Sequence, residues 1–405
     1  MKKILRKVIP NRVVNLLKHL PAATLANLIY GFPSKKMKFI GITGTDGKTT
    51  TTNMIYRILK QAGFKVSMVS TINAEVAGEK IDTGFHVTNP DPFLLQKLIS
   101  KSLKVGTEIF VLEVTSHGLD QFRTWGINFE VGVITNITHE HLDYHGTWEN
   151  YFNAKAKLIK NAEVAVLNRD ENSFDRLAKL AKGKVISFGL GKEADFNPQI
   201  CDCNLCIPGE YNELNALAAI AATSVFGVSK EKAIKVLDQF ASLEGRMQYV
   251  KNDLGIKIVV DFAHTPNALE NALKALRPET KGKLIAVFGC AGLRDVGKRP
   301  LMGEISAKLA DLTVITSEDP RGLIAEINSQ ILKGARKGGG EVGKNVFIEN
   351  DRQKAIGLAI QKAGRGDLVG IFGKGHEQSI NIDGTTELPW SDTEAVREVL
   401  DGRKI

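Results

Sequence analysis

The chain lacks the long apolar runs and the cysteine pairs that mark membrane-spanning and disulfide-bonded proteins. In 405 residues no apolar stretch approaches the roughly 20 needed to cross a bilayer, and the first residues hold no continuous signal-peptide core. The four cysteines are Cys201, Cys203, Cys206 and Cys290. No second C-x-x-C pair or nearby histidine completes a zinc site. A zinc site at these cysteines stays an alternative. We expect reduced thiols, the first three on a strand, in a cytoplasmic protein.

Acidic residues are absent before Asp46, while the same segment holds nine lysines and arginines. The chain has 54 basic and 45 acidic residues, so 54 − 9 = 45 basic residues remain and the rest is neutral. A neutral body gives a nucleic-acid role no electrostatic support. Within the basic segment, apolar residues recur at roughly helical spacing from Ile4 to Leu20, interrupted by Pro10 and ended by Pro21. This segment is either a helix packed on the next domain or a contact with a membrane surface.

Low-complexity linkers and internal repeats are also absent, and strand-like apolar runs alternate with helical patterns instead. The expected strands cover 38–42, 64–69, 108–114, 132–137 and 164–167, then 256–260, 284–288, 312–315, 346–348 and 368–372. Such alternation predicts βαβ units and mostly parallel sheets covered by helices. We therefore expect two α/β domains, over 38–243 and 244–405, after a basic segment over 1–37.

A glycine-rich loop, Gly44-Thr45-Asp46-Gly47-Lys48-Thr49-Thr50, lies between the first strand and a helix expected to begin near Thr49. Main-chain N–H groups and a helix N-terminus attract an anion, while the lysine adds a charge and the threonine a hydroxyl for Mg²⁺. Ile42 stands where the strict G-x-x-x-x-G-K-[ST] pattern has glycine, so a turn without phosphate relevance is the alternative. The order of strand, loop and helix favours an ATP or GTP site in a P-loop-type domain.

Polar residues follow two further strands, at the edge where a parallel sheet presents ligands. Glu113 closes one strand and could hold Mg²⁺ opposite Thr49; it is followed by Thr115, Ser116, His117, Gln121 and Arg123. The next strand leads to His139, His141, Asp143 and His145. These side chains suit a second Mg²⁺ or Mn²⁺, or else form a structural turn.

Lys155 lies on the apolar stripe of the next helix, with Tyr151 and Leu158. Burial favours the neutral form of an amine, which can react with carbon dioxide to give a carbamate that binds metal. Snorkelling of the ammonium past the aromatic residues explains the pattern equally well.

Three polar turns follow strands of the second domain and carry Asp261, His264, Arg294 and Glu377. One such turn is weak evidence for a binding site, because glycine commonly occurs in turns between helices and strands. Three at one sheet edge indicate a second ligand-binding rim, which suits an enzyme that joins two substrates.

Together these segments resemble the Mur ligase family, the ATP-dependent amide-forming enzymes of peptidoglycan precursor synthesis, and within it the UDP-N-acetylmuramoyl-tripeptide synthetases. The family loop T-G-T-[ND]-G-K-T matches 43–49, E-V-S-S-H-G-L is similar to 113–119, and H-L-D-Y-H-G matches 141–146. Segments 209–215, 245–247, 261–266, 298–303 and 373–377 follow in family order. The resemblance covers about residues 38 to 390 and implies a central ATPase domain followed by a Rossmann-like amino-acid-binding domain.

The resemblance also implies ATP, two Mg²⁺ sites and a carbamate on Lys155. ATP would contact Gly44 to Thr50 together with Asn215, Arg246, Asp261 and His264. One Mg²⁺ would be held by Thr49 and Glu113, the second by Glu113, His141 and Lys155; these residues and Lys48 would carry catalysis. A muramoyl dipeptide would contact Thr88, Asn89, Thr115, Gln121 and Arg123, and the incoming amino acid Arg294, Glu318, Asp319, Pro320, Arg321, Gly373 and Glu377.

The implied reaction adds a third, diamino acid to UDP-N-acetylmuramoyl-L-Ala-D-Glu through an acyl phosphate. Small molecules would be the partners of a monomer, with membrane contact through the basic segment as an addition. Asn89 departs from a family threonine, and Glu318-Asp319-Pro320-Arg321 departs from the D-N-P-R of diaminopimelate-selecting members, which leaves lysine and ornithine open.

Residues 1–37 are too few for the UDP-gripping domain with which family members begin. A ligase for a lipid-linked or otherwise UDP-free acceptor is therefore an alternative. A folylpolyglutamate synthetase, and a nucleotide-dependent scaffold without ligase activity, are others.

Overall fold

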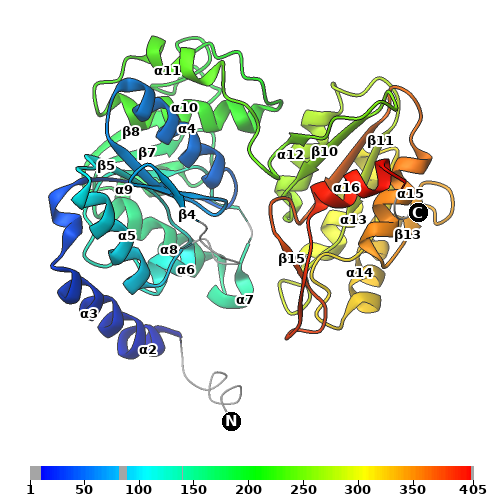
Figure 1. The fold of residues 1–405 in the computed structure, drawn as a ribbon, viewed down its shortest axis with the longest axis horizontal. Helices are drawn as coiled ribbons and strands as arrows, with labels where there is room; N and C mark the ends of the chain where they lie inside the picture. The colour runs from blue at the N-terminus through cyan, green and yellow to red at the C-terminus, as the bar shows by residue number, and fades with distance from the viewer. Residues whose placement is uncertain (1–10, 82–88, 139, 403–405) are drawn as a thin grey trace. The chain divides into compact units, whose positions relative to one another are not determined.

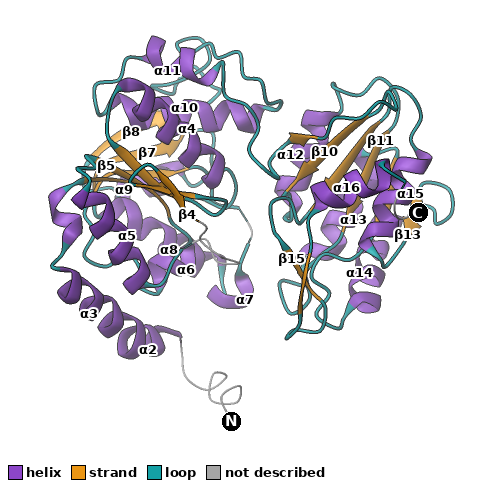
Figure 2. Ribbon diagram, viewed as in Figure 1, coloured by secondary structure: helices purple, strands orange, loops and turns teal. Residues whose placement is uncertain are grey.

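The computed structural model describes residues 11–81, 89–138 and 140–402, and it divides into two compact α/β units. The first comprises Met1–His139, His145–Leu205 and Asn212–Phe240; the second comprises Glu140–Tyr144, Cys206–Tyr211 and Ala241–Ile405. Each unit has a central sheet with helices around it (Figures 1 and 2). No helix in the described ranges is long and apolar enough to cross a membrane.

The first unit is built on an eight-stranded sheet of order β4-β3-β2-β5-β1-β6-β7-β8. The strands are β1 Lys38–Thr43, β2 Val66–Val69, β3 Ala74–Val76, β4 Glu79–Ile81, β5 Ile109–Glu113, β6 Phe129–Ile134, β7 Ala162–Asn168 and β8 Lys184–Phe188. All neighbours from β2 to β8 are parallel, and β3 and β4 add an antiparallel hairpin at the edge. β1 is therefore central, and its carboxyl end carries the glycine-rich loop.

Helices surround this sheet because each parallel crossover must return along one of its faces. The helices are α2 Asn11–Val14, α3 Leu20–Tyr30, α4 Lys48–Ala62, α5 Pro92–Lys104, α6 Ser116–Asp120, α7 Leu142–His145, α8 Trp148–Lys160, α9 Phe174–Leu180, α10 Glu210–Ser224 and α11 Lys230–Leu237. A π-helical turn, η1 Asn15–His19, joins α2 to α3, and a 3₁₀ turn, η2 Pro33–Lys36, precedes β1. Strand β1 is buried on both faces from Phe39 to Thr43, as the apolar sequence of a central parallel strand requires.

The second unit has a six-stranded sheet of order β13-β12-β11-β14-β10-β9, in which only β9 is antiparallel. The strands are β9 Gln248–Tyr249, β10 Lys257–Asp261, β11 Leu284–Phe288, β12 Leu312–Ile315, β13 Val346–Ile348 and β14 Leu368–Phe372, with a separate hairpin of β15 Ser379–Asn381 and β16 Glu387–Pro389. The helices are α12 Pro266–Leu276, α13 Lys298–Leu309, α14 Ile324–Lys337, α15 Arg352–Lys362 and α16 Asp392–Leu400.

Two apolar clusters cover the two faces of this second sheet. Along β11, Ala286 and Phe288 pack with residues of α12, α13 and α14, while Ile285 and Val287 pack with residues of α15 and α16. This alternation follows from the two-residue period of a strand. Both faces are apolar, so the polar residues of the unit gather at the strand ends.

The predicted α/β class with mostly parallel sheets is confirmed, and two local predictions are wrong. The run that contains Cys201, Cys203 and Cys206 is not a strand: the N–H of Cys201 donates to the carbonyl of Asn197 at 2.9 Å, as in a turn. None of these three cysteines forms a disulfide bond in the structure, and neither does Cys290. Pro21 does not end the helical run either, because it occupies the first turn of α3, where its missing N–H is not needed.

Candidate active site

The glycine-rich loop is held in shape by the strand next to β1. The main-chain N–H groups of Thr45 and Asp46 donate to the side-chain oxygen of Asn136 at 3.1 and 2.9 Å, and the hydroxyl of Thr135 donates to the carbonyl of Asp46 at 2.6 Å. A Cβ on Gly44 would lie 1.8 Å from the Thr135 hydroxyl, so this position excludes any larger residue. The two residues that follow β6 therefore fix the conformation of the loop.

Gly47 ends the loop with a left-handed φ of 82° immediately before α4 begins at Lys48. That φ favours glycine, and a Cβ there would also lie 2.2 Å from the side-chain oxygen of Asn215. Asn215 comes from α10 and also accepts the Thr51 hydroxyl at 3.2 Å. The predicted nucleotide residue Asn215 thus touches the loop. The Lys48 ammonium donates to the Thr45 carbonyl at 2.7 Å, within the loop itself.

Glu113 lies beside the loop, fully buried at the end of β5. The Thr49 hydroxyl donates to one of its oxygens at 3.1 Å, and the hydroxyl and N–H of Thr71 donate to its two oxygens, each at 2.8 Å. A threonine hydroxyl and a carboxylate in contact are oxygen ligands of the kind that Mg²⁺ prefers. The pair Thr49 and Glu113 fits the predicted metal ion, and Thr71, which the sequence reasoning missed, orients its carboxylate.

Four of the five residues predicted to bind the acceptor form one hydrogen-bonded group next to Glu113. Asn89 donates to the Glu113 carbonyl at 2.6 Å and accepts the N–H and hydroxyl of Thr115 at 2.7 and 2.8 Å. The guanidinium of Arg123 donates to the Asn89 carbonyl at 2.6 Å and to Gln121 at 2.8 and 3.1 Å. The fifth, Thr88, lies outside the described residues. Asparagine at position 89 binds both the end of β5 and the start of α6.

Lys155 is buried on α8 with 1% of its surface exposed. Its ammonium donates to the carbonyl of Gly44 at 2.5 Å and lies 4.7 Å from the centre of the Tyr151 ring. The Tyr151 hydroxyl contacts the Thr45 hydroxyl at 3.0 Å. The snorkelling interpretation fails because the amine points into the loop rather than to solvent.

The residues of the predicted histidine cluster belong to different units. His145 contacts the Ser116 hydroxyl at 3.0 Å, and burial together with the charge of His117 lowers its pKa to about 4. His139 lies outside the described residues. His141 has a left-handed φ of 55° and belongs to segment 140–144 of the second unit, so its part in the metal site of the first unit stays a prediction. Within the described ranges no group of three or more His, Cys, Asp or Glu side chains is arranged to hold a metal ion.

In the second unit, the predicted nucleotide residues gather around Phe262, which the sequence reasoning did not single out. The Arg246 guanidinium lies 4.3 Å from the centre of the Phe262 ring, and the rings of His264 and His376 lie 4.4 and 5.0 Å from it. Asp261 accepts the N–H groups of Met247 and Ala263 at 2.7 and 2.8 Å. Asp261 therefore fixes the chain on both sides of an aromatic and cationic platform.

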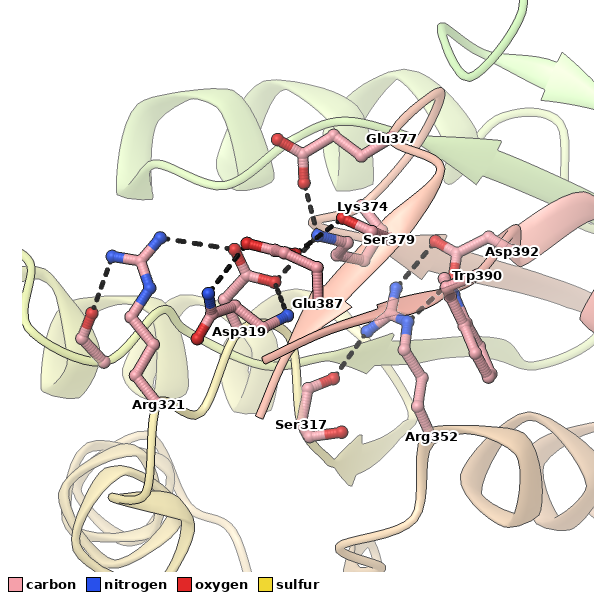
Figure 3. Close-up of polar contacts among 12 residues, drawn as sticks. Ser317, Asp319, Arg321, Arg352, Lys374, Glu377, Ser379, Glu387, Trp390 and Asp392 are labelled. Atoms are coloured by element: carbon pink, nitrogen blue, oxygen red, sulfur yellow. Dashed lines mark hydrogen bonds and ion pairs between the residues drawn. The ribbon is translucent and has the colours of Figure 1, made fainter. Parts of the chain in front are cut away.

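The predicted amino-acid rim is a cluster of opposite charges with Lys374 at its centre (Figure 3). The buried Lys374 ammonium donates to Asp319 at 2.9 Å and to Glu377 at 2.5 Å. Burial acts to lower the pKa of Lys374, but the charges of Glu377 and Asp319 outweigh it and the pKa lies above its usual value. The guanidinium of Arg321 reaches the carbonyl of Gly292 at 3.1 Å and Asp319 at 3.4 Å. Lys374 thus holds two of the predicted carboxylates in place.

Arg352 anchors the two chain segments that carry this cluster (Figure 3). Its guanidinium donates to the carbonyls of Ser317 and Phe372 at 2.9 and 3.0 Å and forms a two-pronged ion pair with Asp392, both bonds at 2.7 Å. Both side chains of the pair are at most 1% exposed. Ser317 and Phe372 directly precede the Glu318 and Gly373 segments, so the pair joins the ends of β12 and β14.

Glu318 is the buried member of the predicted rim. Burial raises the pKa of its carboxyl to about 7, although Lys298 and Lys374 act against the shift. Its Oε2 has no hydrogen-bond partner among the described residues. A Cβ on Gly373 would lie 3.4 Å from this carboxylate, so Gly373 contacts it. Pro320 is buried, while the exposed Arg294 makes no described polar contact with the cluster.

Strained backbone collects at the predicted site segments. In the described ranges seven non-glycine residues have a positive φ, and five of them are Phe122, His141, Met247, Leu293 and Arg321. Each is a predicted site residue or adjoins one. Such conformations cost about 1–3 kcal/mol each and concentrate at functional sites. This signal supports the selection of these segments and was not visible in the sequence.

Comparisons with known proteins match most of the chain. The chain matches the model of the Mur ligase middle domain over residues 42–223 and that of the Mur ligase, glutamate ligase domain over residues 245–375. It is 39% identical to the "UDP-N-acetylmuramoyl-L-alanyl-D-glutamate--2,6-diaminopimelate ligase 1" of Clostridium acetobutylicum, over 93% of this chain and 81% of that protein. An Aquifex aeolicus ligase of the same name without the numeral is 38% identical, over 93% and 80%.

Solved structures give the same picture. A 2,6-diaminopimelate ligase structure of this kind is 31% identical with a TM-score of 0.60, and covers 90% of this chain and 78% of that one. The fold is also that of Mycobacterium tuberculosis folylpolyglutamate synthase, at 18% identity and a TM-score of 0.70, over 95% and 96% of the two chains.

Proposed function

The chain belongs to the Mur ligase family, and from this premise we propose that it joins a diamino acid to UDP-N-acetylmuramoyl-L-alanyl-D-glutamate at the expense of ATP. The similarity to diaminopimelate ligases over 93% of the chain supports 2,6-diaminopimelate as that amino acid. The observation that carries the proposal is the contact of Thr49 with the buried Glu113, directly beside the Asn89 and Arg123 group. A nucleotide loop and a set of polar acceptor residues therefore meet at one sheet edge.

The reaction proceeds in two steps on this chain's own groups. The terminal carboxylate of the muramoyl dipeptide, oriented by Thr115, Gln121 and Arg123, attacks the γ-phosphorus of ATP, and ADP leaves. Lys48 and the N–H groups of the loop stabilise the charge on the phosphoryl oxygens. The amine of the diamino acid then attacks the acyl carbon, phosphate leaves, and the amine proton passes to solvent or a base.

Mg²⁺, which the family uses, would be held by Thr49 and Glu113 and would neutralise phosphate charge. Nucleotide contacts with Asn215, Arg246, Asp261 and His264 belong to the same proposal. For the amino acid, Arg321 offers a cation to a distal carboxylate, while Asp319 and Glu377 offer anions to a distal ammonium. Arg294, Glu318, Pro320 and Gly373 complete the proposed rim.

We include in the proposal a carbamate on Lys155, which with His141 and Glu113 would bind a second Mg²⁺. The chemistry needs a buried amine and dissolved carbon dioxide: the ammonium loses one proton, the neutral nitrogen bonds to the carbon and loses a second proton, and an anionic oxygen pair replaces a cation. Lys155 meets the first requirement, since its amine is buried against the Gly44 carbonyl.

Lys155→Arg and Lys155→Ala test the carbamate. Arginine keeps the positive charge but forms no carbamate, so both variants lose activity if the carbamate matters, and acetate partly restores only the alanine variant. Labelled bicarbonate should give a carbamate carbon resonance in the wild type that both variants lack. Full activity of Lys155→Arg would contradict the carbamate and leave the ligase proposal intact.

The ligase activity is tested by phosphate release from ATP in the presence of acceptor and amino acid. We expect release that needs both, and a product with added diaminopimelate in mass spectrometry. A panel with lysine and ornithine sets the selectivity, and Asp319→Asn, which restores the asparagine of D-N-P-R, should raise the ratio of diaminopimelate to lysine turnover about tenfold. ATP hydrolysis at the same rate without acceptor and amino acid would contradict the ligase proposal.

A UDP-free acceptor is the second candidate. Product from a lipid-linked muramoyl dipeptide, with none from the UDP-linked one, would favour it. The exposed apolar helix at residues 11–30 is the observation on its side.

A further inference from the structure

Residues 11–30 form one continuous helical segment, α2, η1 and α3, whose small residues face the protein and whose large residues face outward. Ala23, Ala26 and Asn27 are fully buried, and Asn27 donates to the Trp125 carbonyl at 2.9 Å. On the opposite side Leu17, Leu25, Leu28 and Ile29 are 76%, 51%, 61% and 62% exposed. Figure 1 shows α2 and α3 along the outside of the first unit, beside α5.

This orientation is the reverse of what a surface helix in water adopts. An amphipathic helix buries its large apolar residues and turns small or polar ones to solvent. Here Val13 and Leu16 extend the exposed row, and the six residues of this outer face lie within 20 positions of the chain. Single exposed leucines are normal, but several large apolar residues exposed along one short helical segment indicate a binding surface.

Most of the charges around the outer face are positive. The first 45 residues contain nine lysines and arginines and no acid, and Arg12, Lys18, Lys35 and Lys36 are exposed around the helix. The Asn15 amide and the Lys157 ammonium both donate to Asp120, each at 2.7 Å, so Lys157 lies beside η1. Lys157, Lys160 and Lys182 line an open cavity of about 570 Å³, together with one acid, Glu163. The neighbouring surface therefore also holds more lysines than acids.

We propose that the outer face docks on an anionic phospholipid surface, with its leucines among the acyl chains and its lysines and arginines on the headgroups. Exposed leucine and isoleucine residues bordered mainly by cations have the composition of a helix that lies in a membrane interface. A protein partner of comparable area would be expected to meet acids and hydrogen-bonding groups on this face as well. Docking is independent of the ligase chemistry.

Sedimentation with vesicles tests the docking. We expect the full chain to bind vesicles of phosphatidylcholine with phosphatidylglycerol, to bind pure phosphatidylcholine weakly, and to dissociate as salt rises. Leu25→Glu with Ile29→Glu should weaken binding at least about tenfold. The matched control, Leu254→Glu with Ile348→Glu, changes exposed apolar residues of the second unit, 56% and 42% exposed, and should bind as the wild type does.

Three outcomes would overturn docking. These are no vesicle binding and no self-association, equal binding of the two double variants, and no vesicle binding together with self-association that only Leu25→Glu with Ile29→Glu abolishes. The last result would make the outer face a protein interface. Unchanged turnover of a UDP-linked acceptor by the same variant keeps this test separate from the ligase proposal.

Discussion

The two predicted binding regions contain different kinds of chemical group. In the first unit, the loop at 44–50 is shaped by main-chain groups and neutral side chains, and both Lys48 and Lys155 donate to carbonyls of the loop. In the second unit, Lys374 donates to two carboxylates, and Arg352 is paired with Asp392. We propose that the first region binds an anion through N–H groups and cations, while the second contains cations and anions together.

This difference matches the charges of the proposed ligands. A triphosphate is wholly anionic, and main-chain N–H groups bind it without carrying charges that must themselves be balanced. A diamino acid carries ammonium and carboxylate groups, and a cluster that already balances its own charges can bind both. Changes to the two regions should therefore have different consequences.

The largest effect should come from the first region. Lys48→Met should lower kcat/KM for ligation about a thousandfold, because no neutral group replaces a charge at the γ-phosphate. Lys60→Met, on the same helix but in an exposed pair with Glu75, should change it less than about twofold. The measurement is phosphate release that depends on acceptor and amino acid. Equal losses in the two variants would contradict a special role for the Lys48 charge.

Substitutions in the second region should mainly lower the stability of the fold. Arg352→Met leaves Asp392 buried and unpaired, and we expect the free energy of unfolding to fall by about 3–5 kcal/mol. Arg397→Met, which removes an exposed pair with Glu394, should lower it by less than about 1 kcal/mol. Urea unfolding measures both, and a small effect of Arg352→Met would show that the anchor between β12 and β14 is dispensable.

Lys374→Met should act on binding more than on chemistry. Without the ammonium, Asp319 and Glu377 repel each other, so KM for the diamino acid should rise about tenfold while kcat falls less. Lys374→Arg should restore part of the affinity, and Lys337→Met, in the exposed pair with Glu304, should be neutral. A fall in kcat alone, with KM unchanged, would contradict this positioning role.

The pH dependence of stability should depend on Glu318, with an effect no larger than that of Arg352→Met. Its pKa is about 7 in the folded protein, against an ordinary 4.5, so the folded state holds its proton longer than the unfolded state. Stability from this group therefore falls as pH rises from about 4.5 to about 7, by up to about 3 kcal/mol. In urea unfolding at pH 5 and 7, Glu318→Gln should remove that slope; an unchanged slope would place the titration on another group.

Much of the fold was predictable because parallel strands are short apolar runs. β11, β12 and β14 have the predicted bounds, while β6 begins at Phe129, three residues before the predicted 132. No sequence signal predicted β9, β15 or β16, which are only two or three residues long. The cysteine run alternated like a strand but forms a turn, because alternation alone does not supply a neighbour to pair with.

The candidate site was predictable where motifs are contiguous. The loop, Glu113 and the 115–123 segment are read directly from strand ends, and the structure brings them together. The roles of Thr71, Phe262 and Lys374 were not predicted from the sequence, because each acts through contacts with residues far away in the chain. The exposed row on α3 was missed for the same reason, because a sequence pattern does not state which helix face is covered.

By itself the sequence determined the α/β class, the order of the strands along the chain and the residue types available at each strand end. These follow from local periodicity and from glycines that only certain turns require. Only the tertiary structure decided which side chains meet, which lysine is paired with acids, and which face of residues 11–30 points outward. The physical reason is that burial and pairing depend on neighbours across the sheet and between layers, and these neighbours exist only once the chain has folded.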